Sequence, residues 1–460
     1  MLLVNFKRKI ALLLSMALML GLLSGCAVTV ERPSDKDVNL ERHIENLNEI
    51  SNTGLHNLNE PQEITESNYQ DENDSFTEYD TAEIADVSIG EDSETETDDV
   101  AEENKNSQAD TVDYQDLRIY TDEEIAQSGA SNVGRFAYER LSPDEKKIYN
   151  EIFMALSELS AGAYLDCLDS ELVNKIFVCV MTDHPEIFWT TGYVCSRYTR
   201  GDELEAIGFR GDYSKTKETI EQNKQLIDAY VNNCLSGLPA GDDYSKIKYI
   251  YEYIILNTDY DLSAPDNQNI CSVFINGKSV CQGYAKATQY LLNKAGVMCT
   301  LVSGVVSNNE SHSWNLVSAD GSYYYVDTTW GDASYITNEP TTFVPPVSYD
   351  YLCVTTTDLL RTHTPQPIVD LPLCGSYKDN YYVREGAYFM SVDTNQLADL
   401  FGRYKNAGRE YVTIKCNDMN VYSSMEDYLI NSQHIFDYID TDGTVSFWKT
   451  EDEASISFKL

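Results

Sequence analysis

The fold and chemistry of this chain are decided by three short motifs that follow one another in its second half. They read Val280-Cys281-Gln282-Gly283-Tyr284, Ser311-His312-Ser313-Trp314-Asn315 and Tyr325-Val326-Asp327-Thr328-Thr329-Trp330. A thiol, an imidazole and a carboxylate in this order are the parts of a cysteine nucleophile, the base that activates it and the group that orients the base. Together, Cys281, His312 and Asp327 indicate acyl-transfer chemistry.

The first motif lies at the start of a predicted helix. A polar turn at 277–281 leads to the cysteine, and residues 284–296 have the composition of a helix closed by a C-terminal glycine. Cys281 is therefore expected at a helix N-terminus, where the positive end of the dipole favours thiolate and backbone N–H groups can bind an oxyanion. The backbone N–H of Gln282 is a candidate donor to that oxyanion.

The other two motifs are predicted to lie on strands. Residues 297–306, 312–317 and 323–327 have strand patterns, and the turn at 319–322 joins the last two into a hairpin. His312 and Asp327 then lie on adjacent strands and can be cross-strand neighbours. The carboxylate would hold the tautomer of the imidazole while the other ring nitrogen faces Cys281.

Each of the three residues also has an ordinary structural explanation. Cys281 alone could be a buried core thiol, His312 a surface residue and Asp327 a turn former. The candidate bases of the folded part are His184, His312, His363 and His434. Of these, only His312 lies in a predicted strand beside the helix that begins with the cysteine, so the joint interpretation as a triad is favoured.

The motifs resemble those of the bacterial transglutaminase-like superfamily. The similar positions are Val280 to Lys286, Gly304, His312 to Asn315 and Tyr325 to Asp332, within residues 246–332. The resemblance implies an α+β fold with a papain-like core, in which a cysteine helix packs on an antiparallel sheet. It also implies that Cys281 is the nucleophile, His312 the base and Asp327 the orienting group.

Weaker similarity extends on both sides of these motifs. Tyr260-Asp261 and the segment 343–363, with Arg361-Thr362-His363-Thr364, resemble segments of extracellular bacterial relatives. No chemical partner for His363 can be named from the sequence, and we interpret it as structural.

The implied reaction is attack of the Cys281 thiolate on an amide carbonyl, which gives a thioester while His312 protonates the leaving amine. A lysine amine as acceptor would make the protein a crosslinking enzyme, and water would make it a protease or amidase. The sequence leaves both open. We expect no cofactor and no metal, since nothing resembling a calcium apparatus or a Cys/His zinc spacing is present.

Trp314 and Trp330 neighbour the predicted base and its orienting carboxylate. Either could line a substrate groove and exclude water, or simply pack beside the catalytic strands. With Gln282 they form a tentative set of groove residues.

The N-terminus is typical of a secretory signal. The basic residues Lys7, Arg8 and Lys9 precede a short apolar run that ends in Leu23-Ser24-Gly25-Cys26, which resembles a bacterial lipobox. We expect residues 1–26 to be a lipoprotein signal and Cys26 to be lipidated, so that the protein is anchored to the extracytoplasmic side of the membrane. An ordinary cleaved signal with a chance cysteine is the alternative.

The next segment is strongly acidic. Residues 31–110 contain 25 Asp and Glu but only 4 Lys and Arg, which accounts for half of the chain's net charge of −42. Because such a composition offsets little of the entropy of ordering, residues 27–116 are predicted to be a disordered tether. The acidity therefore says little about the folded part.

The remaining residues divide into three predicted parts. These are an N-terminal helical region at 117–242, a transglutaminase-like core at 243–372 and a small α+β domain at 373–460. Helices are expected at 142–156, 213–234, 244–257 and 393–404, the first with Ser142 as N-cap and Glu145 completing a capping box. Strands are expected at 410–416 and 445–449.

Eleven cysteines are present. Apart from Cys26 and Cys281, nine remain, and an odd number outside the cell implies a free thiol or an intermolecular bridge. Several, such as Cys179 in an apolar run, are expected to be buried.

Two hypotheses follow. The favoured one is a monomeric cell-surface cysteine acyl-transfer enzyme whose partner is a protein or peptide substrate in the cell envelope, with no role in binding nucleic acid. The other is a non-catalytic binding or scaffold protein of the envelope that keeps a transglutaminase-like fold.

Overall fold

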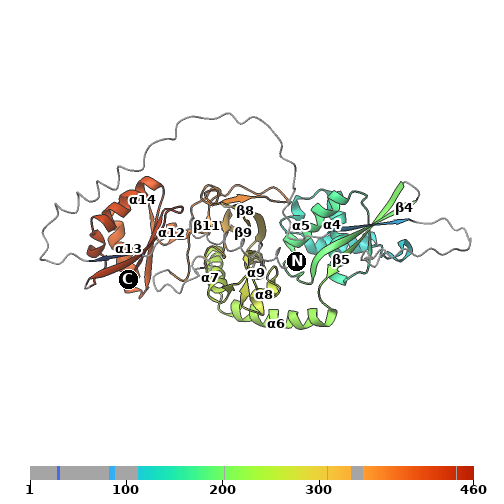
Figure 1. Ribbon diagram of the computed structural model, residues 1–460, viewed down its shortest axis with the longest axis horizontal. Coiled ribbons are helices and arrows are strands. Elements are labelled where there is room, and N and C mark those ends of the chain that lie inside the picture. Colours follow the sequence, from blue (N-terminus) through green and yellow to red (C-terminus); the bar gives the residue numbers. More distant parts are fainter. Residues whose placement is uncertain are drawn as a thin grey trace, which may run out of the picture.

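The fold is described from a computed structural model. It covers residues 28–31, 82–88, 112–200, 203–307, 309–332, 345–441 and 443–460. Three lobes follow one another along the longest axis of the molecule, with the N-terminal lobe at one end, the lobe carrying Cys281 in the middle and the C-terminal lobe at the other end (Figure 1). The molecule mixes helices and sheets throughout.

The N-terminal lobe packs helices on a sheet. Its elements are η1 (Tyr114–Asp116), α3 (Asp122–Asn132), η2 (Tyr138–Arg140), α4 (Pro143–Glu158), β3 (Ala163–Leu165), α5 (Ser170–Asp183), β4 (Thr190–Arg200) and β5 (Glu203–Tyr213). The predicted capping box of α4 is confirmed, because the Ser142 side chain accepts from Glu145 N and the Glu145 side chain accepts from Ser142 N.

The prediction of a helical region at 117–242 is incomplete, because this lobe also contains a sheet. Strands β4 and β5 form a long antiparallel hairpin, with Cys195 opposite Phe209, and β3 pairs with the far edge of β5. Phe209, Cys195 and Tyr193 are buried in the core, so the apolar side chains of the hairpin supply one wall for α4 and α5. The helical segments dominate the sequence pattern, which is why the sheet was not predicted.

The central lobe consists of helices that cover one antiparallel sheet. The helices are α6 (Lys217–Ser236), α7 (Asp243–Leu256), α8 (Ile270–Phe274), α9 (Cys281–Lys294) and α11 (Thr356–Leu359). The sheet has the order β11-β10-β9-β8-β12, with β8 (Cys299–Val306), β9 (Ser311–Ala319), β10 (Ser322–Val326), β11 (Leu352–Val354) and β12 (His363–Pro365). A short pair, β6 (Asp259–Tyr260) and β7 (Lys278–Ser279), precedes α9.

The predicted cysteine helix and hairpin are confirmed. Helix α9 contacts β8 and β9, and the Asn315 side chain of β9 donates to Ala285 O of α9 at 2.9 Å. In the β9–β10 hairpin Asn315 lies opposite Val326, and in the β8–β9 pair His312 lies opposite Gly304. His312 and Asp327 are therefore placed diagonally across adjacent strands, as the hairpin predicts.

The C-terminal lobe is a second α+β unit. Its elements are α12 (Tyr381–Arg384), β13 (Tyr388–Phe389), α13 (Thr394–Asn406), β14 (Tyr411–Cys416), α14 (Met419–Glu426), η3 (Asp427–Asn431), η4 (His434–Asp437), β15 (Thr444–Thr450) and β16 (Ser455–Lys459). The sheet has the order β1-β15-β16-β14-β13, in which β1 is Val28–Glu31. The helix and the two strands expected from the sequence are confirmed by α13, β14 and β15.

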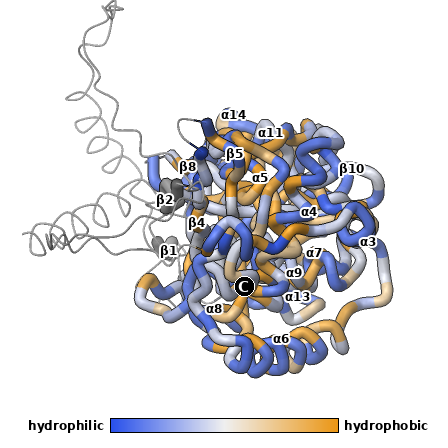
Figure 2. The backbone as a smooth tube through the Cα atoms, turned by 90° about the vertical axis from the view of Figure 1, so that its right-hand side faces the viewer, coloured by the Kyte–Doolittle hydropathy of each residue, from blue (hydrophilic) through white to orange (hydrophobic). Residues whose placement is uncertain are grey.

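The three lobes share a continuous apolar interior. One connected cluster of buried residues includes Ile152 of the N-terminal lobe, Leu291 of the central lobe and Ile456 of the C-terminal lobe. Tyr349 and Tyr381 stack across the boundary to the C-terminal lobe, with ring centroids 3.8 Å apart. Viewed along the long axis, α6 lies at the outer rim with mostly hydrophilic residues along it (Figure 2).

Two segments within the predicted tether form strands. Strand β1 (Val28–Glu31) pairs with β15, and β2 (Ala82–Ser88) pairs in parallel with β4. At these places the prediction of disorder differs from the structure, and both segments contain β-branched residues that favour an added edge strand. Cys26 and the predicted signal lie outside the described residues. Within the described ranges, no helix has the length and apolar character needed to span a bilayer.

Candidate active site

Cys281 is the first residue of α9, as predicted. The N-cap residue Val280 makes no side-chain capping hydrogen bond, and the thiol is half-buried. The positive end of a 14-residue helix therefore lies directly at the sulfur. The sulfur also borders a cavity, so the nucleophile is accessible from one side.

Gly283 allows α9 to begin in a crowded place. A Cβ at this position would lie 2.0 Å from Ser279 Oγ and 2.7 Å from Ser272 Oγ. These two hydroxyls are themselves hydrogen-bonded at 2.6 Å, and they fix the turn that leads to Cys281. Any larger side chain at Gly283 would displace the start of the helix and with it the thiol.

His312 connects the thiol to the carboxylate. Its Nε2 donates to Asp327 Oδ2 at 2.6 Å, which leaves Nδ1 for Cys281, to which His312 is also hydrogen-bonded. Burial lowers the pKa of His312, but the Asp327 carboxylate and the Cys281 side chain raise it more, and the pKa rises to about 10. The imidazolium is thus the stable form at neutral pH, as in a thiolate–imidazolium pair.

Asp327 is held from two directions. Its Oδ1 accepts from the backbone N–H groups of Thr329 and Trp330, at 2.8 and 3.1 Å, while its own N–H donates to Tyr351 O at 3.0 Å. Burial raises the pKa of Asp327, but His312 and His363 lower this pKa by more than burial raises it. The pKa of Asp327 therefore lies well below its usual range. The carboxylate is therefore ionised and oriented before any substrate binds.

His363, for which no chemical partner could be named from the sequence, lies in this site and contacts Asp327. Its Nε2 lies 3.2 Å from Asp327 Oδ2, the same oxygen that His312 contacts, and its Nδ1 lies 2.8 Å from Thr362 Oγ1. Burial lowers the pKa of His363, although Asp327 opposes this effect. The sequence signal was the weak resemblance of residues 361–364 to extracellular bacterial relatives, and the pairing of β12 with β8 is needed to see where His363 points.

The two tryptophans surround the histidines. Trp314 has no exposed surface and lies against His312 and His363, with ring centroids 5.9 and 4.9 Å away. Trp330 lies 4.7 Å from His363 and contacts Tyr351. Gln282 is buried in the first turn of α9. Trp314 thus packs behind the imidazoles, and a groove role for Gln282 and Trp330 stays a prediction.

A cavity of about 140 Å³ opens beside the thiol. It is lined by Cys281 and His312 together with Phe136, Val178, Thr182, Thr300, Leu301, Val302, Ser303, Ser311, Ser313, Gln366, Pro367, Ile368, Val369 and Leu371. None of these carries a carboxylate, an ammonium or a guanidinium group. In a chain with a net charge of −42, the lining of this cavity apart from Cys281 and His312 is a local uncharged surface.

The N-terminal lobe supplies part of this cavity. Phe136 and Val178 form one wall, and the segment 366–371, which follows β12, forms another. Arg140 joins the two walls, because its guanidinium lies 3.4 Å from the centre of the Phe136 ring and its Nε donates to Asp370 O at 2.9 Å. This contribution could not be read from the sequence, because the residues lie about 100 positions or more from the motifs.

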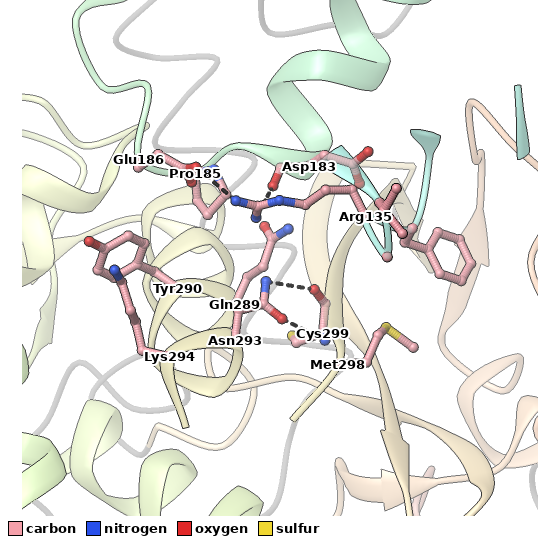
Figure 3. A pocket seen from close by; sticks show the side chains of 13 residues that line it. Arg135, Asp183, Pro185, Glu186, Gln289, Tyr290, Asn293, Lys294, Met298 and Cys299 are labelled. Carbon is pink, nitrogen blue, oxygen red and sulfur yellow. Dashed lines mark hydrogen bonds and ion pairs between the residues drawn. The ribbon is translucent and has the colours of Figure 1, made fainter. Parts of the chain in front are cut away.

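Figure 3 shows a second cavity, of about 370 Å³. Phe136 lines both this cavity and the first one. Arg135 spans the upper side of the second cavity, donating to Asp183 O and to Glu186 Oε1 at 2.8 and 3.0 Å. Below them, the Asn293 side chain bonds both backbone groups of Cys299. This charged cavity lies between the N-terminal lobe and α9, and contains none of the predicted site residues.

His312, Asp327 and His363 also form the one group among the described residues that could hold a metal ion, with ligand atoms within 4.8 Å of one another. However, both imidazole Nε2 atoms lie within hydrogen-bond distance of the same carboxylate oxygen. The carboxylate therefore occupies the place between the nitrogens that an ion would need. The arrangement fits a hydrogen-bonded acid–base system better than a metal centre.

The cysteines of the described residues form no disulfide bonds. All ten cysteines in the described part of the chain are free thiols, and eight of them are buried. Burial raises the pKa of Cys179 and Cys195 to about 12. These thiols are inert core residues, in contrast to Cys281 at its helix terminus.

Comparisons with known proteins find similarity within the central lobe. Residues 233–328 match the model of the Transglutaminase-like superfamily. Kyphoscoliosis peptidase of Homo sapiens is 27% identical over 124 residues, which are 24% of this chain and 18% of that protein. The Mus musculus protein of the same name is 27% identical over 108 residues, 20% of this chain and 16% of that protein. The chain thus spans less than a fifth of the length of these curated relatives.

The chain was also compared with solved structures. A crystal structure of a TGase covers 35% of this chain and 48% of its own, at 16% identity and a TM-score of 0.23. The central lobe is a transglutaminase-like domain in a chain of mixed helix and sheet.

Proposed function

We propose that this protein is a cysteine acyl-transfer enzyme that acts on peptide or protein amides through a thioester at Cys281. The observation that carries the proposal is the continuous hydrogen-bonded series of Cys281, His312 and Asp327 beside an uncharged cavity. The transglutaminase-like domain, which resembles papain-like cysteine enzymes, supports the same chemistry.

The first step follows from this geometry. The Cys281 thiolate attacks the carbonyl carbon, a C–S bond forms, and the carbonyl electron pair moves to oxygen near the positive end of α9. When the tetrahedral intermediate collapses, the C–N bond breaks and the imidazolium of His312 gives its Nδ1 proton to the leaving amine. Asp327 keeps the Nε2–H side of the ring fixed throughout.

The acceptor of the acyl group decides the name of the reaction. Water would add to the thioester and release a carboxylic acid with the free thiol, whereas a primary amine would form a new amide bond. We propose water, because the relatives with partial similarity are named as peptidases. Crosslinking to an amine is the second outcome that the experiments distinguish.

The lining of the cavity supports a preference for substrates with uncharged side chains. Apart from Cys281 and His312, its side chains are apolar or neutral, and Leu301, Val302 and Phe136 are largely buried in its walls. Burial of a charged substrate side chain there would cost desolvation energy without a compensating partner. We propose that the residue next to the reacting amide is uncharged.

We also propose that the enzyme is anchored to the extracytoplasmic face of a membrane through Cys26. The lipobox-like sequence Leu23-Ser24-Gly25-Cys26 supports this location. Detergent phase partitioning of the expressed full chain tests it. The wild type should enter the detergent phase and Cys26→Ala should not, and equal behaviour of the two would contradict the anchor.

Alkylation of the thiols tests the enzyme against the scaffold alternative. Iodoacetamide should modify Cys281 much faster than the other cysteines, and His312→Ala should abolish the difference. Cys167, the other half-buried cysteine of the described residues, is the matched control. Slow labelling of Cys281 at the rate of Cys167, in the wild type as well as in the variant, would favour a non-catalytic scaffold.

The acceptor is tested by mass spectrometry of products. The full chain is incubated with glutamine-containing peptides that have apolar neighbours, with and without a primary amine. Cleavage or deamidation that is unaffected by the amine indicates hydrolysis. Peptide carrying the mass of the amine at a glutamine identifies transamidation and overturns the choice of water.

A further inference from the structure

A series of hydrogen bonds leads from Asp327 toward the C-terminal lobe. It is formed by the side chains of His363, Thr362, Tyr351 and Glu453, and we call it the rear chain. His363 Nε2 lies 3.2 Å from Asp327 Oδ2, and His363 Nδ1 lies 2.8 Å from Thr362 Oγ1. Thr362 Oγ1 lies 2.8 Å from the Tyr351 hydroxyl, which in turn lies 2.6 Å from Glu453 Oε1. All five residues are buried. The series thus joins the triad carboxylate to a residue in the turn between β15 and β16.

The far end of this chain belongs to the C-terminal lobe. Glu453 Oε2 pairs with Lys415 Nζ of β14 at 2.9 Å, and the same ammonium lies 3.2 Å from Asp350 Oδ1. Asp350 also accepts from the Tyr382 hydroxyl and from Ser455 Oγ, at 3.1 and 3.0 Å. This buried ionic cluster fixes the position of Glu453 with several contacts from both lobes.

The hydroxyl groups restrict how protons can be placed along the chain. Tyr351 and Thr362 each have one hydroxyl proton. If Glu453 is a carboxylate, Tyr351 donates to it, Thr362 donates to Tyr351, and His363 Nδ1–H donates to Thr362. If Glu453 is protonated, all three bonds reverse and His363 Nδ1 is an acceptor.

Both arrangements have the same consequence for Asp327. In the first, His363 carries protons on both nitrogens, and in the second it carries one on Nε2. In either case Nε2–H faces Asp327 Oδ2 and donates to it. Burial raises the pKa of Glu453 and lowers the pKa of His363, so burial disfavours the charged form of each residue. The carboxylate therefore always has a donor behind it.

The rings around His363 prevent other orientations. Trp314, Trp330 and Tyr351 have ring centroids 4.9, 4.7 and 5.1 Å from the imidazole. A side chain so enclosed, with a polar partner at each ring nitrogen, is held in one position. A purely space-filling role would require no such pair of partners.

We propose that His363 is a positioning residue of the acyl-transfer reaction, and that Glu453, through Tyr351 and Thr362, makes the C-terminal lobe a working part of the active site. The inference rests on the proposed function. It assigns to the C-terminal lobe the task of holding the Asp327 carboxylate toward His312. No residue of this rear chain touches the substrate cavity.

Four variants of the full chain test the inference. Tyr351→Phe removes one hydroxyl from the chain and keeps the ring against Trp330. His363→Leu removes both polar contacts, and His363→Gln restores a donor that can reach Asp327. Tyr324→Phe is the matched control, because the buried Tyr324 hydroxyl bonds Ser376 and Asp379 and is not part of the chain.

Two measurements are made on each variant, the rate of Cys281 alkylation and the steady-state cleavage of the amide substrate. Tyr351→Phe and His363→Leu should lower kcat with little change in KM, and should slow alkylation in parallel. We expect losses of about 10- to 100-fold, the range seen when partners that orient metal ligands are removed. His363→Gln should recover most of the loss, and Tyr324→Phe should behave as the wild type.

The outcomes separate this inference from the proposed function. Alkylation needs no substrate, so a wild type that alkylates rapidly but cleaves nothing overturns the proposed peptidase activity while the variants still test the positioning role. Wild-type rates in Tyr351→Phe and His363→Leu overturn the inference. So does a loss in His363→Gln as large as in His363→Leu, because a donor would then not be what matters. The far-downfield proton signal of His312 Nε2, measured with ¹⁵N-labelled histidine, should move in Tyr351→Phe but not in Tyr324→Phe.

Discussion

The front and the rear of Asp327 are built from the same type of residue but behave differently. In front, His312 lies 2.6 Å from the carboxylate, contacts Cys281, and has its pKa raised to about 10. Behind, His363 lies 3.2 Å from the same oxygen, and burial lowers its pKa. Both rings are buried, so burial alone does not decide the charge of an imidazole. The closer carboxylate and the neighbouring thiol decide it for His312.

This difference suggests a division of roles. The front half opens to a cavity in which bonds can be made and broken, whereas the rear half ends in a closed ionic cluster of the C-terminal lobe. Damage to the front should therefore reduce activity more than stability, and damage to the rear cluster should reduce stability most. The following predictions test this comparison.

Asp327→Asn should have the largest effect, because this residue belongs to both halves. Both carboxylate oxygens face only N–H donors, from His312, His363, Thr329 and Trp330. The NH₂ group of the asparagine side chain would therefore face N–H donors, either those of His312 and His363 or those of Thr329 and Trp330. We expect kcat to fall by about 10⁴-fold, as for the acid of Ser–His–Asp triads.

Steady-state kinetics on the purified full chain measure this loss. Asp358→Asn is a suitable control, since Asp358 is also a buried carboxylate but bonds Thr355 at the start of α11. An Asp327→Asn enzyme within tenfold of the wild type would show that the carboxylate is not needed to orient His312.

Lys415→Met should be the most damaging change for stability. Lys415 is buried between Asp350 and Glu453, and removing its ammonium leaves buried acidic groups without a cation. Breaking a buried pair in this way costs about 3–5 kcal/mol of unfolding free energy. Chemical denaturation followed by circular dichroism measures the change.

Lys449→Met offers the comparison within the same lobe. Lys449 pairs with Glu426 at 2.8 Å, but both side chains are partly exposed to solvent. The loss there should be below about 1 kcal/mol, as for surface pairs. Equal losses in the two variants would mean that the Lys415 cluster is not the stabilising element we describe.

The stabilising contribution of His312 should depend on pH. Its pKa is raised from 6.5 to about 10, so the folded state binds a proton more tightly than the unfolded state. This contribution is fully present below the ordinary value and is lost as the pH rises toward about 10. The difference in Tm between the wild type and His312→Gln should accordingly shrink from pH 6.5 to 10.

His363 should act in the opposite sense. Its pKa is lowered, so the buried neutral ring costs stability as the pH falls below the ordinary histidine value.

A Tm difference for His312→Gln that is constant over the alkaline range would contradict the assigned charge of His312.

Val178→Glu should give the smallest effect, confined to substrate choice. Val178 of α5 lines the cavity from the N-terminal lobe and takes no part in the hydrogen bonds of the triad. A carboxylate there would disfavour apolar substrate residues and favour basic ones, by up to about tenfold in kcat/KM, as expected for one altered pocket contact. Competition between two peptides that differ at one residue measures the shift. Unchanged preference would show that substrates do not occupy this cavity.

Much of the central lobe could be predicted because its determinants are local. The glycine after α9, the alternating strands and the turn at 319–322 fix the helix and the hairpin with little help from distant residues. Since the hairpin sets the spacing of His312 and Asp327, the contact between these two side chains could also be predicted. The β4–β5 hairpin, the strand β2 and the role of His363 could not, because each depends on which segments pair across long sequence distances.

The sequence by itself therefore determined which functional groups meet, namely a thiol at a helix N-terminus with an imidazole and a carboxylate on neighbouring strands. Only the tertiary structure decided the surroundings of these groups. The cavity walls come partly from the N-terminal lobe, and the rear chain ends at Glu453 in the C-terminal lobe. The physical reason is that hydrogen bonds within a helix or hairpin are set by local spacing, whereas burial and contacts between lobes depend on how the whole chain packs.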